Sequence, residues 1–218
     1  NILNKIPSKS NHFKNAAIES DLSILSAILQ KEKNVVVYQR AVKEMKTEIE
    51  TLLKLNVQLR LSGSKKQILE KISNKMEACN CHVPLFTSDI IQLLEQFKRI
   101  SGVASFRLNL FAVNSNMCQR FHTDINDLRL LCTYSGQGTF WLPEEAADRN
   151  SHHDGGQNEE IVLKPELIQQ ANEGDVLILK GALFPNAKAA IHRSPSIEES
   201  GEIRLLLRID TNESSVFD

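Results

Sequence analysis

Two histidines and one aspartate stand at spacings that suit a metal site. His122 and Asp124 lie two residues apart, and His192 follows 68 residues after Asp124. Side chains two apart on an extended strand point to the same face, so one imidazole and one carboxylate can reach one ion. Two histidines and a carboxylate, with the other positions open, are the donor set of non-haem iron(II) centres. The sequence therefore predicts a metal site at His122, Asp124 and His192, with Fe(II) as the expected ion and Zn or Ni as substitutes.

The same alternation of side chains along a strand predicts further residues around this site. Cys118 and Arg120 share the face of His122 if no bulge interrupts the strand. Asn109, on the β-rich segment before, is a third candidate neighbour of the metal ligands. For all three the alternative is an ordinary structural role outside the pocket. Arg193, next to His192, should face away from the metal.

Other metal-ligand types along the chain give weaker patterns. Cys79, Cys81 and His82 cluster, but no second pair of thiols matches them, so a loop between helices is the preferred interpretation. The pair His152–His153 lies in the polar, acidic segment 144–160, which we interpret as a mobile loop and a candidate lid. Four cysteines in 218 residues do not make a disulfide scaffold.

The first hundred residues have the periodicity of helices. Apolar residues recur at spacings of three and four over 21–30 and 41–55. A capping box begins a helix at Ser64, and another helix is expected to begin near Ser88. Only 34–40, with three successive valines, indicates a short strand. Residues 1–101 are therefore expected to form a helical region that supports the rest and does not fold alone.

From residue 102 the apolar period changes to two, and glycine-rich turns separate short β-rich runs. The expected strands are 106–113, 128–134, 139–142, 161–163, 175–180 and 203–209. Many short strands with such turns are typical of an antiparallel sandwich or jelly roll. We therefore predict the α+β class, with a helical N-terminal half packed on a double-stranded β-helix at 102–218 that carries the metal.

Composition excludes some partners. There are 26 Lys and Arg against 27 Asp and Glu, which leaves a net charge of -1 and argues against a nucleic-acid binder. No apolar run has the roughly 20 residues of a membrane helix, and no targeting segment is evident. A cytoplasmic location and a small-molecule or peptide substrate are the expectations, without nucleic-acid or membrane partners. The oligomeric state is left open.

The order of these motifs resembles a known superfamily. His122-x-Asp124, Gly174-Asp followed by a strand, His192-Arg and then Arg204 is similar to the double-stranded β-helix of 2-oxoglutarate/Fe(II)-dependent oxygenases. The resemblance implies that Arg204, twelve residues after His192, binds the distal carboxylate of 2-oxoglutarate as cosubstrate. A bidentate guanidinium suits that carboxylate. It also implies assistance from Tyr134 or Arg129, which lie on the strand expected after His122-x-Asp124.

A second resemblance covers about residues 103–210 more closely, to the bacterial domain-of-unknown-function family 1826. It rests on the segments Cys118-Gln-Arg-Phe-His-Thr-Asp, Arg129-Leu-Leu-Cys-Thr-Tyr, Trp141-Leu-Pro, Gly174-Asp-Val, Leu179-Lys-Gly, His192-Arg-Ser-Pro and Arg204-Leu-Leu-Leu. That family implies a link to zinc homeostasis. Two functions therefore remain open: an oxygenase that oxidises an unknown substrate, and a non-enzymatic jelly-roll protein that binds zinc. A third reading is a sandwich that serves only as an interaction module.

Overall fold

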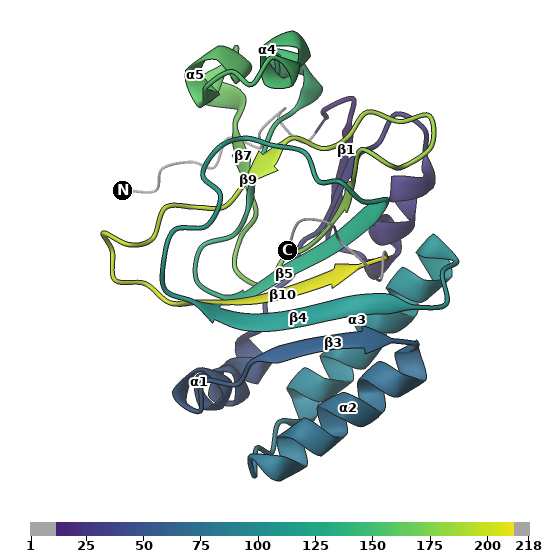
Figure 1. Cartoon of the computed structure of the whole chain (residues 1–218), viewed down its shortest axis with the longest axis vertical. Helices are drawn as coiled ribbons and strands as arrows, with labels where there is room; N and C mark the ends of the chain where they lie inside the picture. Colours follow the sequence, from purple (N-terminus) through teal and green to yellow (C-terminus); the bar gives the residue numbers. More distant parts are fainter. Residues whose placement is uncertain (1–11, 212–218) are drawn as a thin grey trace.

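A seven-stranded sheet forms the centre of the protein, for which a computed structural model describes residues 12–211. Its strands run in the order β1-β2-β8-β5-β10-β4-β3, and all neighbours are antiparallel except β1 and β2. The strands are β1 (Ala16–Glu19), β2 (Val35–Tyr38), β3 (Leu59–Gly63), β4 (Phe106–Val113), β5 (Leu128–Ser135), β8 (Val176–Lys180) and β10 (Arg204–Asp210). Figure 1 shows the long strands lying side by side across the middle of the molecule.

A three-stranded sheet, in the order β7-β6-β9, lies apart from the large one. Its strands are β6 (Phe140–Trp141), β7 (Gln169–Gln170) and β9 (His192–Arg193). An antiparallel β-bridge between His122 and His192 adds the segment around His122 to the edge of this sheet. The two sheets enclose a core of their own, with Trp141, Leu177 and Leu206 among its members. Two sheets that are antiparallel apart from the β1–β2 pair, packed around one core, form a jelly roll. The predicted α+β class with a jelly roll is therefore confirmed.

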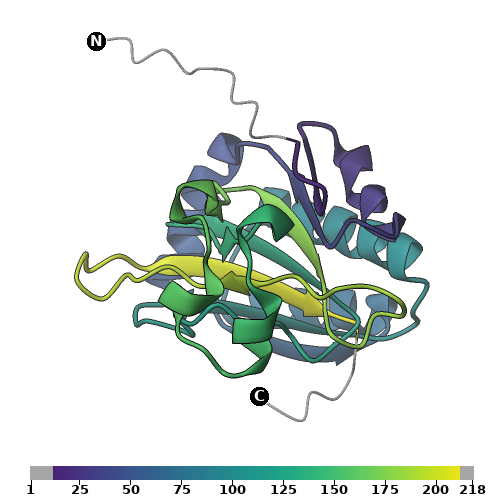
Figure 2. The ribbon, with the colours of Figure 1, turned by 90° about the horizontal axis from the view of Figure 1, so that it is seen from above.

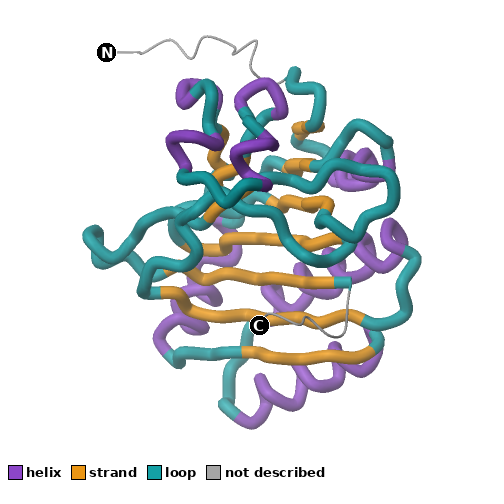
Figure 3. Tube along the Cα trace, turned by 45° about the horizontal axis from the view of Figure 1, so that its top comes forward, coloured by secondary structure: helices purple, strands orange, loops and turns teal. Residues whose placement is uncertain are grey.

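Helices cover the other face of the large sheet. These are the 3-10 helices η2 (Leu22–Leu29) and η3 (Lys43–Met45) and the α-helices α1 (Lys46–Lys54), α2 (Lys65–Ala78) and α3 (Pro84–Ser101). Figure 2 shows these N-terminal helices gathered along one side of the sheet, and Figure 3 shows them behind the row of strands. Leu205, Leu207 and Ile209 of β10 join the large core against the helices, while Leu206 joins the core between the sheets. The strand alternation thus separates two apolar layers.

The chain between β6 and β7 forms short helices where a mobile loop was predicted for 144–160. They are η4 (Glu144–Ala146), α4 (Arg149–His153) and α5 (Asn158–Ile161), and η5 (Pro165–Leu167) follows them. Side chains hold this helical insertion to the chain before His122: Asn158 accepts a hydrogen bond from the Phe121 amide (2.8 Å) and donates one to the Gln119 carbonyl (3.0 Å). The strand expected at 161–163 is wrong, because 158–161 continues as helix α5.

The N-terminal region is less purely helical than expected. The predicted strand at 34–40 is present as β2, but β1 and β3 were not predicted. The capping box at Ser64 is present, whereas the helix expected near Ser88 already begins at Pro84. Strands from both sides of residue 102 pair within one sheet, so the hydrogen bonding shows no boundary there. The division into 1–101 and 102–218 stays a prediction.

Candidate metal centre

The backbone brings His122 and His192 together. The amide of each donates to the carbonyl of the other at 2.9 Å, so the two residues form a reciprocal antiparallel pair. Asp124 follows two residues later, where the amide of Ala182, just after β8, donates to its carbonyl at 2.8 Å. Gly181 permits this contact, because a Cβ there would collide with the carbonyl oxygen of Asn126. The end of β8 therefore fixes the loop that carries Asp124.

The three predicted ligands converge. One donor atom from each of His122, Asp124 and His192 lies within 4.8 Å of the others, and no second such cluster occurs among residues 12–211. The Nε2 of His192 lies 3.3 Å from Oδ2 of Asp124, and the Nε2 of His122 lies 3.7 Å from Oδ1. Separations of this size suit ligand atoms around a single ion, since each would lie about 2 Å from the metal.

Hydrogen bonds at the other ring nitrogen orient both imidazoles. The Nδ1 of His122 lies 2.8 Å from the carbonyl oxygen of Arg120, and the Nδ1 of His192 lies 3.2 Å from that of Ala190. A carbonyl only accepts, so a protonated Nδ1 on each ring would donate to it and leave Nε2, which faces Asp124, available to a metal ion. Backbone carbonyls hold metal-binding histidines in the same way in known sites.

The charges of the cluster call for a cation. Burial, together with the neighbouring His192, lowers the pKa of His122 to about 4, so this imidazole is neutral near pH 7. Burial alone would raise the pKa of Asp124, but His192, Arg129 and His122 together hold it well below its usual range. Oδ2 of Asp124 is buried without a hydrogen-bond partner among the described residues. A carboxylate oxygen and two imidazole Nε2 atoms that face one another fit a metal ion, which all three would bind.

Arg129 contacts the cluster directly. It donates to Oδ1 of Asp124 (2.8 Å) and to Oδ1 of Asp210 (2.7 Å), and Asn126 also donates to Asp210 (2.9 Å). Strand β5, which follows Asp124 in the chain, thus supplies a guanidinium that orients a candidate metal ligand. The sequence suggested Arg129 for the cosubstrate, and the structure shows its two aspartate contacts.

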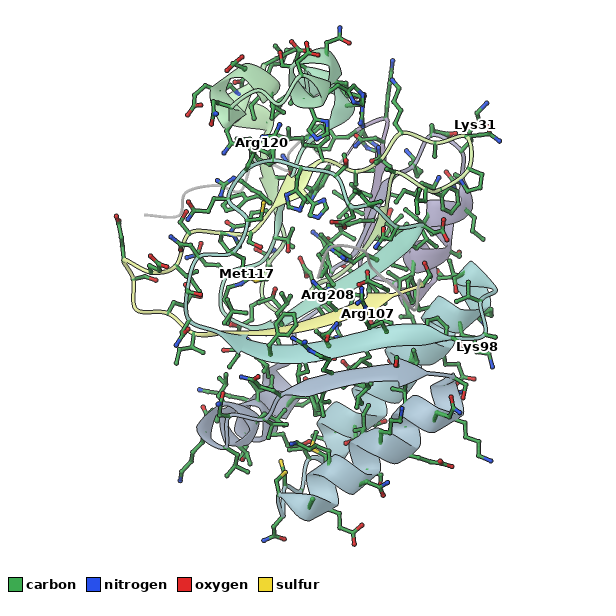
Figure 4. The ribbon with its side chains drawn as sticks, in the orientation of Figure 1. Lys31, Lys98, Arg107, Met117, Arg120 and Arg208 are labelled. Atoms are coloured by element: carbon green, nitrogen blue, oxygen red, sulfur yellow. The ribbon has the colours of Figure 1, made fainter. Side chains whose placement is uncertain are left out.

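A cavity of about 520 Å³ opens onto the three ligands. Its polar lining includes Cys118, Thr139 and Ser194, and its apolar lining consists of Met117, Ile125, Leu131 and Leu206. Figure 4 shows Met117 on a loop across from Arg107 and Arg208, which belong to neighbouring strands of the large sheet and also line the cavity. A volume of this size is typical of a site for small molecules.

Arg204 lies at the far end of β10 from the metal cluster. Its side chain is 1% exposed, and it donates to the Gln137 carbonyl (2.8 Å) and to the Thr133 hydroxyl (3.3 Å). Its Nη1 is buried without a partner among the described residues. Burial lowers the pKa of Arg204 to about 10, so it remains a cation near pH 7. Arg204 is not part of the cavity lining, although it shares a strand face with Leu206, which is.

The prediction for Tyr134 is wrong. Alternation along β5 turns its side chain to the helical face of the sheet, where it packs on Phe86 and donates to Oδ2 of Asp89 at 2.6 Å. The neighbouring Thr133 faces the other way and contacts Arg204. Neighbouring residues of a strand face opposite sides of the sheet, so a shift of one position decides whether Thr133 or Tyr134 lies on the side of the candidate site.

The three further candidates have different places. Cys118 lines the cavity, with Sγ 3.5 Å from Nδ1 of His122. Arg120 does not line it: its guanidinium donates to the carbonyls of Gly156 (2.9 Å) and His152 (3.3 Å), and Figure 4 shows it beside the helical insertion. The chain before His122 has no continuous strand partner that would keep it alternating, which is why the expectation fails for Arg120. Asn109 is buried on β4 but is not part of the lining.

Sequence reasoning missed several cavity residues. Thr139, Arg107 and Asp210 all line the cavity, and none was predicted there. Strand alternation could have placed Asp210 and Arg107 there. Asp210 points to the same face of β10 as Arg208, and Arg107 points to the same face of β4 as Asn109. The remaining histidine pair, His152 and His153, lies on α4, and Nδ1 of His152 has no partner within the described part of the chain.

The fold and the site together define a jelly-roll protein with a two-histidine, one-carboxylate cluster open to a cavity. The chain belongs to family DUF1826, described as a protein of unknown function, which matches residues 19–210. No curated relative matches the chain. The helices of the described residues include none that is long and apolar enough to cross a membrane.

Solved structures with a similar arrangement of elements include two oxygenases and a third protein in complex with alpha-KG. AtDAO1 of Arabidopsis thaliana, a dioxygenase for auxin oxidation in a 2-oxoglutarate complex, has a TM-score of 0.48 and 10% identity, over 93% of this chain and 94% of its own. A prolyl-4-hydroxylase of Pseudomonas putida has 0.43 and 8%, over 86% and 96%. The alpha-KG complex, of a full-length Neurospora crassa protein, has 0.42 and 13%, over 89% and 80%. At these values the likeness carries no conclusion about ligands or activity.

Proposed function

We propose that the protein is an Fe(II)/2-oxoglutarate-dependent oxygenase acting on a small organic substrate. The observation that carries the proposal is the cluster of His122, Asp124 and His192 at the wall of a cavity of about 520 Å³, where Oδ2 of Asp124 accepts no hydrogen bond from the described residues. Three protein ligands that leave positions open to a cavity favour catalysis, whereas a structural or storage site is usually fully coordinated by the protein. A cytoplasmic location stays a prediction.

In this proposal Nε2 of His122, Nε2 of His192 and the carboxylate of Asp124 hold the metal. The carbonyls that accept from each Nδ1 keep the rings aimed, and Arg129 keeps Asp124 ionised and oriented. When bound, Fe(II) with 2-oxoglutarate and dioxygen supplies the oxidising chemistry, in which the cosubstrate becomes succinate and CO₂ and a substrate C–H bond is oxidised. Imidazole and carboxylate also accept Zn²⁺ and Ni²⁺, so the donor set does not choose the ion.

Arg204 is the proposed partner of the cosubstrate's distal carboxylate. Its Nε and Nη2 donate to the Gln137 carbonyl and the Thr133 hydroxyl. The buried Nη1 has no partner among the described residues and could donate to an anion. A buried cation without a counterion is costly, and a carboxylate that pairs with it recovers that cost. Thr133 replaces Tyr134 as the hydroxyl in this proposal, because it lies on the same side of the sheet as Arg204.

The test uses the single tryptophan of the chain as a reporter. Trp141 is buried and stands in register with His192 on the neighbouring strand, so a paramagnetic ion at the site should quench its fluorescence. Fe(II) is titrated under argon, and 2-oxoglutarate is then added while the weak visible charge-transfer band of its iron chelate is recorded. We expect quenching with one equivalent of Fe(II) and the band only after 2-oxoglutarate.

Two control variants make this test specific. Asp124→Ala should lose the quenching, and Arg204→Gln should keep the quenching but weaken 2-oxoglutarate binding. Tight stoichiometric zinc binding without any band in the wild type would support the zinc-binding alternative and contradict the oxygenase. Absence of metal binding altogether would contradict both.

A further inference from the structure

Asp210 is a buried carboxylate that lies outside the metal cluster, at the end of β10. It is 1% exposed, and in the register of the large sheet it stands opposite Arg129 of β5. Nε of Arg129 donates to Oδ1 of Asp210 at 2.7 Å, and Nη2 donates to Oδ2 at 3.3 Å. Bonds from one guanidinium to both oxygens of a carboxylate fix the direction of the two groups as well as their distance.

The same guanidinium reaches the metal cluster with its third nitrogen. Nη1 of Arg129 donates to Oδ1 of Asp124 at 2.8 Å. Because a guanidinium is planar and rigid, the two bonds to Asp210 also determine where Nη1 points. The position of Asp124 is thus linked, through Arg129, to a residue on another strand.

Further donors hold Asp210 in place. Nδ2 of Asn126 donates to its Oδ1 at 2.9 Å, and Nε of Arg208 lies 3.4 Å from its Oδ2. Asn126 belongs to the loop between Asp124 and β5. Asp210 therefore connects both this loop and β5 to the end of β10.

The contact with Arg129 makes the two oxygens of Asp124 different. Oδ1 accepts from Arg129, whereas Oδ2 has no hydrogen-bond partner among residues 12–211 and lies 3.3 Å from Nε2 of His192. The terminal torsion of an aspartate is soft, so a carboxylate without such a contact can turn and offer both oxygens to an ion. With Arg129 in place, Oδ2 is the oxygen that remains for the metal.

We propose that Asp210 is a positioning residue for the metal centre, which acts through Arg129 to hold Asp124 with one oxygen turned toward the ion. The inference rests on the metal site of the proposed function and needs neither its cosubstrate nor its reaction. Loss of a group that orients a metal ligand weakens metal binding by roughly 10- to 100-fold. Since Asp210 acts one contact further away, we expect the low end, about tenfold.

The experiment is a double-mutant cycle read by titration with Co(II) alone. The four proteins are the wild type, Asp210→Asn, which keeps the shape of the side chain, Arg129→Gln, and the double variant. We expect Asp210→Asn to raise the dissociation constant of Co(II) about tenfold in the wild-type background and less than about twofold in the Arg129→Gln background. The visible bands of bound Co(II) should also weaken in Asp210→Asn, because they lose intensity when a ligand atom is added. A merely less stable fold would not change these bands at saturation.

Asp127→Asn is the matched control for the loss of one negative charge. Asp127 belongs to the loop between Asp124 and β5, is half-buried and does not line the cavity, so its variant should bind Co(II) as the wild type does. An unchanged affinity in Asp210→Asn overturns the proposal. An equal loss in the wild-type and Arg129→Gln backgrounds also overturns it, since Asp210 would then act without Arg129.

Arg129→Lys provides a second test if Asp210→Asn does not fold, which thermal unfolding of the metal-free protein will show. One ammonium group cannot span two carboxylates as a guanidinium does, so we expect a similar loss of about tenfold. Wild-type affinity and bands in this variant overturn the proposal. Absence of Co(II) binding in the wild type would contradict the metal site, and with it both the proposed function and this inference. Wild-type binding with no effect of Asp210→Asn would overturn this inference alone.

Discussion

Replacing Tyr134 by Phe should lower stability without changing the metal site. The Tyr134 hydroxyl donates to Oδ2 of Asp89 at 2.6 Å, on the helical side of the large sheet. Asp89 also accepts from Nη1 (2.6 Å) and Nη2 (2.9 Å) of Arg40, which in turn donates to the Gly174 carbonyl at 2.7 Å. Burial raises the pKa of Tyr134 well above its usual range, so the hydroxyl keeps the proton that it donates. The network joins α3 to β5 and to the turn before β8.

The magnitude follows from what the variant leaves behind. A hydrogen bond to a charged group contributes about 1.5 to 3 kcal/mol. Asp89 retains both bonds from Arg40 in Tyr134→Phe, so we expect the low end, about 1.5 kcal/mol. For a chain of this size that loss lowers the melting temperature by roughly 3 to 6 °C. Asp89→Ala, which leaves the Arg40 guanidinium buried without its partner, should cost more, about 3 to 5 kcal/mol.

The assay pairs thermal unfolding with titrations of Fe(II) and 2-oxoglutarate. Tyr38→Phe is the matched control, because Tyr38 is the other tyrosine of the chain, lies beside Arg40 and is only partly buried. We expect a lower melting temperature for Tyr134→Phe alone, and the same affinities for metal and cosubstrate in all three proteins. A loss of 2-oxoglutarate affinity in Tyr134→Phe with an unchanged melting temperature would refute the assignment of this side chain to the helical face.

Three further outcomes are expected. His192→Ala should weaken metal binding by more than about 100-fold, read as loss of bound ion in calorimetry, and an unchanged affinity would remove His192 from the ligand set. Asn158→Ala should weaken metal binding by about tenfold, because it removes the hydrogen bonds to the backbone of Gln119 and Phe121. The control Asn150→Ala, on the exposed side of α4, should leave metal binding unchanged, and equal effects of the two variants would contradict this role of Asn158. Gly181→Ala should cost about 1 to 3 kcal/mol of folding free energy, measured by urea unfolding, because the new methyl group meets the Asn126 carbonyl; wild-type stability would show that the loop yields freely.

The sequence predicted those parts of the site that depend on short-range geometry. His122 and Asp124 converge because two residues on an extended segment share a face, and the β-rich runs at β4, β5, β8 and β10 lie where alternation places them. The arrival of His192 beside His122 depended on which strands become neighbours, a property of the whole sheet that no local pattern contains.

The errors have definite physical origins. Tyr134 was assigned to the site although Thr133 is the residue of that pair on the correct face, and a shift of one residue reverses every side chain of a strand. β1 and β3 escaped notice because they are short and lie at the two edges of the sheet, where one partner strand suffices. The segment 144–160 is polar enough to resemble a loop, yet hydrogen bonds cap the first turns of its short helices. The Asp148 carboxylate accepts from the Ser151 amide, and the Gln157 amide donates to the Glu160 carboxylate.

The two arginines on one face of β10 have different surroundings. Arg204 and Arg208 share one face of the strand, with Leu206 between them, so their Cα atoms lie roughly 13 Å apart. Arg208 stands in register with Leu131, two residues from the Arg129 that contacts the metal cluster, whereas Arg204 lies beyond the bulge between Leu205 and Leu206. A single dicarboxylate that chelates the metal and reaches Arg204 would pass Leu206, whereas Arg208 lies 3.4 Å from Oδ2 of Asp210, the aspartate that Arg129 also contacts. Under the proposed function, Arg204→Gln should therefore weaken the binding of 2-oxoglutarate, whereas Arg208→Gln should leave it nearly unchanged. A double variant should show the sum of the two single effects, since sites without shared partners act independently.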